Sequence, residues 1–280
     1  MCAGFAYWDR NGSTPGAGGT SPNGTWGSTS WSPSSAGASA TVGWVDDDTA
    51  FFSAGSDAAG NYTITVSAAH RVGDVYIEEG NVTFAGTGSL ELVNSANIYV
   101  PNGQKATFTV QLSGSAGLAK GDLGELSLTG NNTFTGPVSV NGGILSFNAP
   151  AALGTGTDAI IVSGATLKNL NSATGNFVSD NRAVSIASMG AIFDVPTATA
   201  KLQCASVISG IGPLTKTGNG ALILSEANTY TGITTVSGGT LGVANISGSA
   251  TGFGGVDLLT GGRLTGAGRV SGRQRVDGGM

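Results

Sequence analysis

A stretch of 31 residues occurs twice in this chain, 96 positions apart and without a gap. Residues 118–148 and residues 214–244 share leucine, lysine, glycine, asparagine, threonine and valine at matching places. An internal repeat of this kind indicates stacked structural units, each of which contacts its neighbours. The repeat therefore constrains the architecture more strongly than any single motif in the chain.

The residues between the glycines predict short β-strands. The chain has 48 glycines in 280 residues, and runs such as residues 62–66, 107–112 and 221–224 alternate apolar and small polar side chains. Glycine every few positions disfavours helix, at a cost of about 1 kcal/mol each. An antiparallel sandwich would use hairpins at Asn102-Gly103 and Asn141-Gly142. The repeat instead favours an all-β, right-handed parallel β-helix, a solenoid.

Composition divides the chain into two expected parts. Residues 1–60 hold all four tryptophans in a turn-rich context, which predicts an irregular N-terminal cap with buried rings. Residues 61–280 are expected to form the parallel β-helix, with the repeats at 118–148 and 214–244. A second hypothesis for the cap is sugar or surface recognition by Trp26 and Trp31, because exposed aromatic faces suit the apolar faces of sugars.

Charge and cysteine content exclude several classes of protein. A net charge of −5 disfavours a nucleic-acid partner, which needs clustered Lys and Arg. The arginines between Arg263 and Arg275 are expected to be charges on exposed turns. Cys2 and Cys204 are too few for a disulfide framework, and Cys204 is expected to be buried. No apolar run reaches the length of a membrane helix and no secretory leader is evident, so we expect a piece whose leader lies outside this numbering.

The second copy carries a long motif that identifies a family. Residues 212–243 read L-x-K-x-G-x-G-x-L-x-L, then N-T-Y-T-G, then V-x-x-G-x-L. This segment resembles the autotransporter-associated β-strand repeat of bacterial passenger domains. Residues 118–148 resemble a poorer copy, with Asp122-Leu123 in place of Gly218-Asn219. The tryptophan-rich start and the tail from Gly262 to Gly272 also resemble segments of such proteins.

The resemblance implies where the protein works and with what. It implies a protein secreted by, or displayed on the surface of, a Gram-negative-type bacterium. It also implies an outer-membrane barrel in the full-length protein, with no membrane span in this chain. The expected role is that of a structural stalk or adhesion surface, and the expected partner is an unknown surface ligand, either a glycan or a protein.

Each position of the repeat has an expected structural role. Leucines fill the coil interior, asparagine and glycine form the bends, and an aromatic ring covers a corner. The positions to which we assign such roles are Leu118, Lys120, Leu126, Leu128, Asn132, Phe134, Gly136, Gly142, Leu214, Lys216, Leu222, Leu224, Asn228, Tyr230, Gly232 and Gly238.

We assign no catalytic residue, no metal site and no cofactor, and we expect no enzyme. The alternative is a β-helical polysaccharide-active enzyme, a lyase or hydrolase, which would place paired carboxylates on neighbouring coils. The two acidic groups that such a site could use are residues 46–48 and Asp74 with Glu78 and Glu79, and a solvated surface is the simpler reading of both. His70 is the only histidine, so a His-rich metal site is excluded and a Ser-His-Asp triad would have to use it.

Overall fold

The structure is a computed structural model that describes residues 4–94, 96–172, 177–180 and 182–277. It consists of short strands, and the helical element in the described residues is one 3-10 turn, η1 (Pro150–Leu153). The chain forms two compact units. Unit 1 comprises residues 1–137 and 151–156, and unit 2 comprises residues 138–150 and 157–280.

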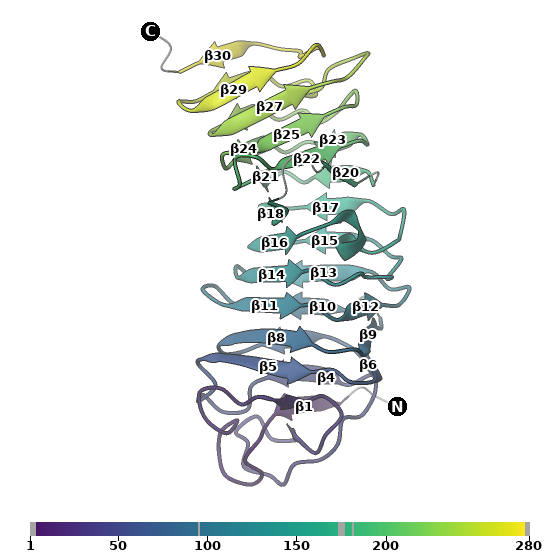
Figure 1. Ribbon diagram of the computed structural model, residues 1–280, viewed down its shortest axis with the longest axis vertical. Helices are drawn as coiled ribbons and strands as arrows, with labels where there is room; N and C mark the ends of the chain where they lie inside the picture. The colour runs from purple at the N-terminus through teal and green to yellow at the C-terminus, as the bar shows by residue number, and fades with distance from the viewer. Residues whose placement is uncertain (1–3, 95, 173–176, 181, 278–280) are drawn as a thin grey trace. The chain divides into compact units, whose positions relative to one another are not determined.

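Unit 1 contains three sheets built from strands that recur once per coil (Figure 1). Neighbouring strands within each sheet run parallel, except that β3 pairs antiparallel with β1. The first sheet holds β3 (Trp31–Ser32), β1 (Phe5–Trp8), β4 (Thr49–Phe52), β7 (Val75–Ile77), β10 (Asn97–Tyr99) and β13 (Leu118–Gly121). The second holds β2 (Gly24–Thr25), β5 (Asn61–Thr65), β8 (Asn81–Ala85), β11 (Lys105–Phe108) and β14 (Glu125–Leu128). The third holds β6 (Ala69–Val72), β9 (Ser89–Leu92) and β12 (Gln111–Ser113).

Unit 2 repeats this organisation with parallel strands. One sheet holds β15 (Val138–Val140), β17 (Ile160–Val162), β20 (Val184–Ile186) and β23 (Ile208–Gly210). Another holds β16 (Ile144–Phe147), β18 (Ala165–Asn169), β21 (Ala191–Asp194), β24 (Leu214–Thr217), β26 (Thr234–Val236), β28 (Val256–Leu258) and β30 (Gln274–Val276). The last holds β19 (Phe177–Asp180), β22 (Lys201–Cys204), β25 (Ala221–Leu224), β27 (Gly239–Val243) and β29 (Gly262–Thr265).

The strand order confirms a parallel β-solenoid in each unit and corrects the hairpin alternative. Asn102-Gly103 turns between β10 and β11, and Asn141-Gly142 turns between β15 and β16. In both cases the two flanking strands belong to different sheets, so they do not pair with each other. The turn residues therefore form corners of a coil and not hairpins.

The second repeat copy shows why one repeat exceeds one coil. Leu214 in β24 pairs with Thr234 in β26, and Leu222 in β25 pairs with Leu241 in β27. The repeat thus contributes two successive strands to each of two sheets. Its apolar residues lie in the coil interior, where Leu222, Leu224, Val236 and Leu241 are fully buried. Burial of such side chains contributes about 1.5–3 kcal/mol each.

Candidate functional site

An asparagine of the repeat holds three consecutive coils together. In unit 2, the side-chain oxygen of Asn228 accepts the backbone N–H of Ile208 at 2.7 Å, and its amide donates to the carbonyl of Ala250 at 2.6 Å. In unit 1, Asn132 accepts the N–H of Leu112 at 2.7 Å and donates to the carbonyl of Ala152 at 2.6 Å. Both asparagines are buried. They satisfy backbone groups that the bend between strands would otherwise leave unpaired.

A lysine of the repeat lies inside each unit. Lys120 and Lys216 are fully buried, and their ammonium groups donate to backbone carbonyls at the next corner. Lys120 reaches the carbonyls of residues 121 and 122, and Lys216 reaches those of residues 217, 218 and 238. Burial lowers the pKa of each lysine to about 8. The role of both lysines in the described structure is to close a corner.

These lysines predict that stability increases with pH above about 8. The ordinary pKa of 10.5 applies in the unfolded chain, so between pH 8 and pH 10 the unfolded state binds more protons than the folded state. The free energy of unfolding should then rise by up to about 2 kcal/mol per lysine. Above pH 10 it should fall, because burial raises the pKa of Tyr62 and Tyr230 and the unfolded chain loses their protons first. Urea unfolding at pH 7, 8, 9 and 10 measures the free energy of unfolding as a function of pH. In the Lys216→Met variant, the increase between pH 8 and pH 10 should be smaller for unit 2. An increase as large as that of the natural chain would show that Lys216 does not cause it.

An aromatic residue of the repeat fills the corner beside the asparagine. Tyr230 is fully buried, and its hydroxyl lies 2.6 Å from the hydroxyl of Thr234, which is also fully buried. At the matching sequence positions the first copy has Phe134 and Val138. The second copy therefore has two hydroxyl groups in contact at this corner, and the first copy has neither of them.

This difference predicts strong coupling between Tyr230 and Thr234. Tyr230→Phe and Thr234→Val should each cost about 1–2 kcal/mol, because each leaves one buried hydroxyl without a partner. The double variant should cost less than the sum of the two, as removing both groups leaves nothing unsatisfied. A double-mutant cycle by urea unfolding measures the coupling energy, and additive losses would show that the hydroxyls do not act as a pair.

The remaining repeat positions, apart from Gly238, lie in the coil interior or at tight corners. Leu118, Leu126, Leu128 and Leu214 are buried. A Cβ added to Gly136 would lie 2.5 Å from the backbone of Gly117, and one added to Gly232 would lie 2.4 Å from the backbone of residue 212. Gly142 has a φ of 113°, which disfavours other residues, whereas a Cβ at Gly238 would meet atoms only at 3.4 Å and beyond.

The tryptophans form a buried cluster at the start of unit 1. Trp8, Trp26 and Trp31 are buried, and the Trp26 ring lies 5.1 Å from Trp31 and 4.9 Å from Trp44 between ring centroids. Phe52 packs against Trp8, Trp26 and Trp31. Trp26 and Trp31 are 1% and 0% exposed, so neither ring offers a face to a sugar. Their burial favours the structural interpretation of this segment.

The first acidic candidate, residues 46–48, makes structural contacts. Asp47 pairs with Arg71 at 2.7 Å, and Asp48 accepts the backbone N–H of Gly4 at 2.6 Å. Asp46 accepts the backbone N–H of Arg71 and lies 3.8 Å from His70 Nδ1. Burial lowers the pKa of His70, more than Asp46 raises it. No serine contacts this histidine among the hydrogen bonds of the described residues, so the triad hypothesis gains no support.

The second acidic group, Asp74 with Glu78 and Glu79, also forms hydrogen bonds with backbone N–H groups. Asp74 accepts the backbone N–H of Asn97 at 2.8 Å, and Glu79 accepts the backbone N–H of Ala58 at 2.9 Å. Burial and the neighbouring Glu79 raise the pKa of Glu78. Glu78 and Glu79 line a cavity of about 280 Å³ with Gln104. In the part of the chain that the structure describes, no group of three or more His, Cys, Asp or Glu could hold a metal ion.

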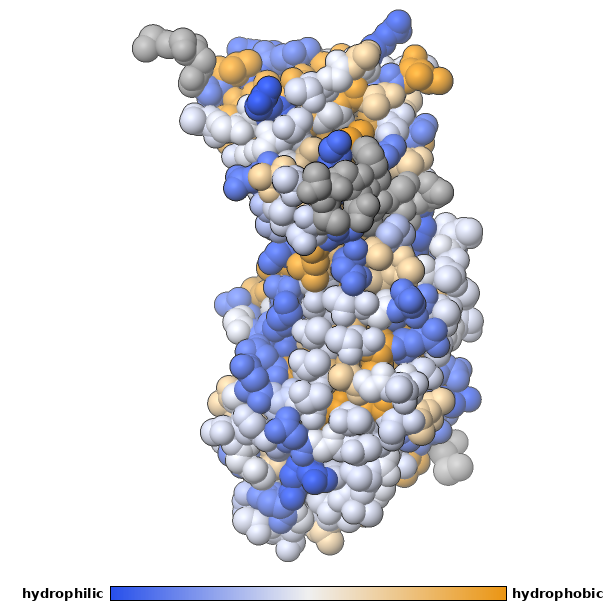
Figure 2. All heavy atoms as spheres, in the orientation of Figure 1, coloured by the Kyte–Doolittle hydropathy of each residue, from blue (hydrophilic) through white to orange (hydrophobic). Residues whose placement is uncertain are grey.

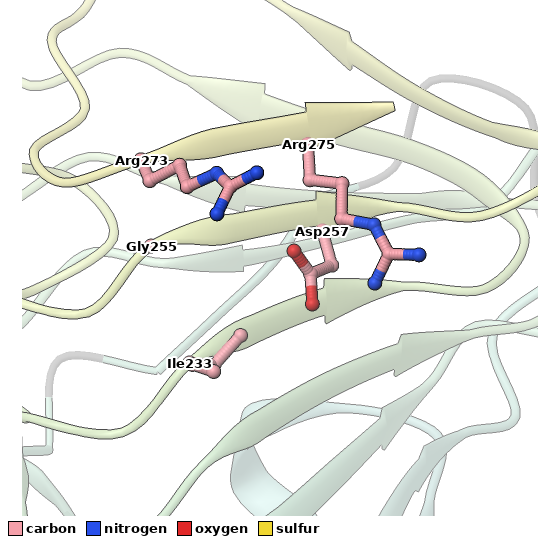
Figure 3. A pocket seen from close by; sticks show the side chains of 5 residues that line it. All are labelled: Ile233, Gly255, Asp257, Arg273 and Arg275. Carbon is pink, nitrogen blue, oxygen red and sulfur yellow. The ribbon is translucent and has the colours of Figure 1, made fainter. Parts of the chain in front are cut away.

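A hollow on the outer face of unit 2 brings together residues from three separate segments of the chain. It has a volume of about 280 Å³ and lies over β26, β28 and β30 (Figure 3). Its lining residues are Ile233, Gly255, Asp257, Arg273 and Arg275. The two arginines are exposed, as expected, but Arg275 lies in strand β30 and not in a turn. The strand register, and not spacing in the chain, places them beside Asp257 and Ile233.

Among the residues that the structure describes, large apolar side chains are exposed more often in unit 2 than in unit 1. Figure 2 shows orange residues around the strands near the C-terminal end of the chain, whereas much of the remaining visible face is white or blue. In the described part of unit 2, the exposed large apolar residues are Ile161, Met189, Ile192, Val207, Ile211, Ile233, Ile246, Phe253 and Val276. Of these residues, Ile233 lines the hollow.

Comparison with known proteins agrees with a solenoid built from these repeats. Residues 118–147 and 214–243 match the Passenger-associated-transport-repeat family. In an alignment 256 residues long that covers 86% of the chain, it is 35% identical to the protein named "Adhesin BmaC autotransporter" of Brucella suis biovar 1 (strain 1330). The chain spans about 7% of the length of that adhesin. Among solved structures there is no significant match.

The fold and the buried lysines and asparagines define a β-solenoid protein stabilised by repeat-encoded corners. The repeat matches and the similarity to the adhesin identify the chain as an autotransporter passenger sequence. This family consists of proteins that Gram-negative bacteria secrete or display on the cell surface. In the described residues, no helix is long and apolar enough to cross a membrane.

Proposed function

We propose that this chain is a non-enzymatic passenger segment that acts as a structural stalk and adhesion surface. The observation that supports this proposal most directly is its 35% identity to an autotransporter named as an adhesin, over 86% of the chain. The geometry is compatible with the role, since the acidic side chains that an enzyme could use make structural contacts. We also propose that residues 1–60 form the N-terminal cap and that residues 61–280 form the parallel β-helix. An outer-membrane barrel that anchors the full-length protein remains a prediction.

The outer face of the coils supplies the adhesion surface in this proposal. Along β18, β21, β24, β26, β28 and β30 the paired outward residues are Thr166, Ile192, Thr215, Thr235, Asp257 and Arg275. Such a column presents hydroxyl, apolar and charged groups at the spacing of paired strands, about 4.8 Å. The buried repeat residues hold this column in place while contributing no contact to a partner. The role of each repeat in this proposal is to hold the outward-facing residues of its strands in position.

Attachment of coated beads to cells tests the proposal. Fluorescent beads carrying the purified chain should attach to cultured epithelial cells several-fold more often than beads carrying an unrelated protein of similar size and net charge. The soluble chain in excess should reduce the attachment. Equal attachment of both kinds of bead would contradict the adhesion role.

A further inference from the structure

The hollow of unit 2 is formed by two columns of outward residues. Thr234, Val256 and Gln274 pair in register, so the residues before them, Ile233, Gly255 and Arg273, lie side by side on successive strands. The next outward column contains Thr235, Asp257 and Arg275. In Figure 3 the Asp257 carboxylate lies between the guanidinium groups of the two arginines.

Glycine at position 255 leaves the centre of the hollow open. A Cβ at this position would lie 2.5 Å from the carbonyl oxygen of Arg273, so a larger residue would force the two strands apart. Ile233 lies on one side of the gap and the arginine side chains lie on the other. At about 280 Å³, the hollow is slightly smaller than the usual ligand pocket, which suits one sugar ring better than a long chain.

The charged groups of the hollow have unused binding capacity. Arg275 pairs with Asp277 at 2.9 Å. Within the described residues, Asp257 forms no ion pair with either arginine of the hollow, and its carboxylate accepts no hydrogen bond from another side chain. Arg273 likewise forms no ion pair there. A free guanidinium and a free carboxylate that line the same hollow as an apolar residue can bind an anionic group and hydroxyl groups at the same time.

The balance of charge decides which class of anion fits. Arg273, Arg275 and Asp257 line the hollow, and Asp277, which lies outside the lining, pairs with Arg275, so one positive charge, that of Arg273, is left beside one negative charge, that of Asp257. A polyanion such as a nucleic acid needs clustered cations and would be repelled by the free Asp257 carboxylate. A molecule with a single acid and several hydroxyls satisfies both charges.

We propose that this hollow binds a carboxylate-bearing sugar unit of a surface glycan. Arg273 binds the sugar carboxylate, Asp257 accepts hydrogen bonds from its hydroxyls, and Ile233 covers the apolar face of the ring. This inference rests on the adhesion role proposed above, for which it names a ligand class and a site.

Ligand-observed NMR titration with methyl glucuronide tests the site, with methyl glucoside as the neutral probe. We expect saturable binding of the glucuronide and at least tenfold weaker binding of the glucoside. Arg273→Ala should weaken glucuronide binding at least tenfold, and Asp257→Ala, which removes the acceptor for the sugar hydroxyls, should weaken it severalfold. The matched control is Arg263→Ala, which removes an exposed arginine of β29 that does not line the hollow, and it should change binding less than twofold.

Four results would overturn the proposal. Equal weakening by Arg263→Ala and Arg273→Ala would indicate unspecific attraction to arginines. Equal binding of the glucoside and the glucuronide would show that the sugar carboxylate does not contribute to binding. Stronger binding of a triglutamate peptide than of the glucuronide would assign the hollow to acidic peptides. No binding of the glucuronide to the natural chain would refute the site outright. Circular dichroism of each variant checks that it is folded.

The bead assay separates this proposal from the adhesion role. If beads coated with the Arg273→Ala chain attach as well as beads coated with the natural chain, the hollow does not mediate adhesion, whereas the adhesion role stands. If beads coated with the natural chain fail to attach, the adhesion role fails, even where the glucuronide binds.

Discussion

Trp26→Ala should destabilise unit 1 by about 3–5 kcal/mol, the loss expected for removing a large buried aromatic side chain. Trp26 is 1% exposed and packs against Trp31, Phe52 and Phe84, with centroid distances of 5.1, 5.6 and 6.1 Å. Alanine at this position would leave a cavity, and the surrounding rings would lose their contacts with the indole. All four tryptophans lie in residues 1–60, so tryptophan fluorescence during urea unfolding reports this unit selectively.

Trp44→Ala is the matched control for this experiment. Trp44 is half-buried, and its indole N–H donates to Asp46 and to the carbonyl of Arg71. The same chemical change should therefore cost clearly less there. A loss below about 1 kcal/mol for Trp26→Ala, together with reduced glycan binding, would instead support recognition by the cap.

Asn228→Ala should have the second largest effect, about 2–4 kcal/mol on unit 2. The substitution leaves the N–H of Ile208 and the carbonyl of Ala250 without their side-chain partner inside the corner. Each unsatisfied buried group costs about 1–3 kcal/mol. Hydrogen exchange measured by mass spectrometry should show faster exchange in peptides that contain Ile208.

Asn219→Ala is the control for the asparagine. Asn219 is exposed in a turn of the same repeat, so its replacement should change stability by less than about 0.5 kcal/mol. If both variants exchanged at the natural rate near Ile208, the bridging role of Asn228 would be wrong. If both variants were equally destabilised, the loss of stability could not be assigned to the two hydrogen bonds of Asn228.

The fold could be predicted because its signal is local and repeated. Alternation along segments such as 221–224 marks strands, and the 96-residue spacing of the two copies indicates stacking. A buried lysine was harder to interpret from sequence, because lysine is mostly exposed. Lys216 is buried since its stem fits the coil interior and its ammonium group reaches three corner carbonyls.

The candidate sugar site could not be predicted from sequence for a physical reason. Ile233, Gly255 and Arg273 are about one coil apart, and coils differ in length because their corners differ. Sequence shows four arginines near the C-terminal end, but it does not show which of them share a column. Only the register brings Arg273 beside Gly255 and Arg275 beside Asp257.

Spin-label distances along one outward column test the central claim most directly. In unit 2, Thr166, Ile192, Thr215, Thr235, Asp257 and Arg275 pair in succession on parallel strands. After replacement of Cys2 and Cys204 by alanine, labels at Thr166→Cys and Arg275→Cys are separated by five strand spacings, about 24 Å, and labels at Thr166→Cys and Asp257→Cys by four, about 19 Å. Narrow distributions near these values, differing by about one spacing, are the predicted result. Broad distributions, or separations that do not increase from one strand to the next, would contradict the stacked parallel coils on which the adhesion surface and the sugar site depend.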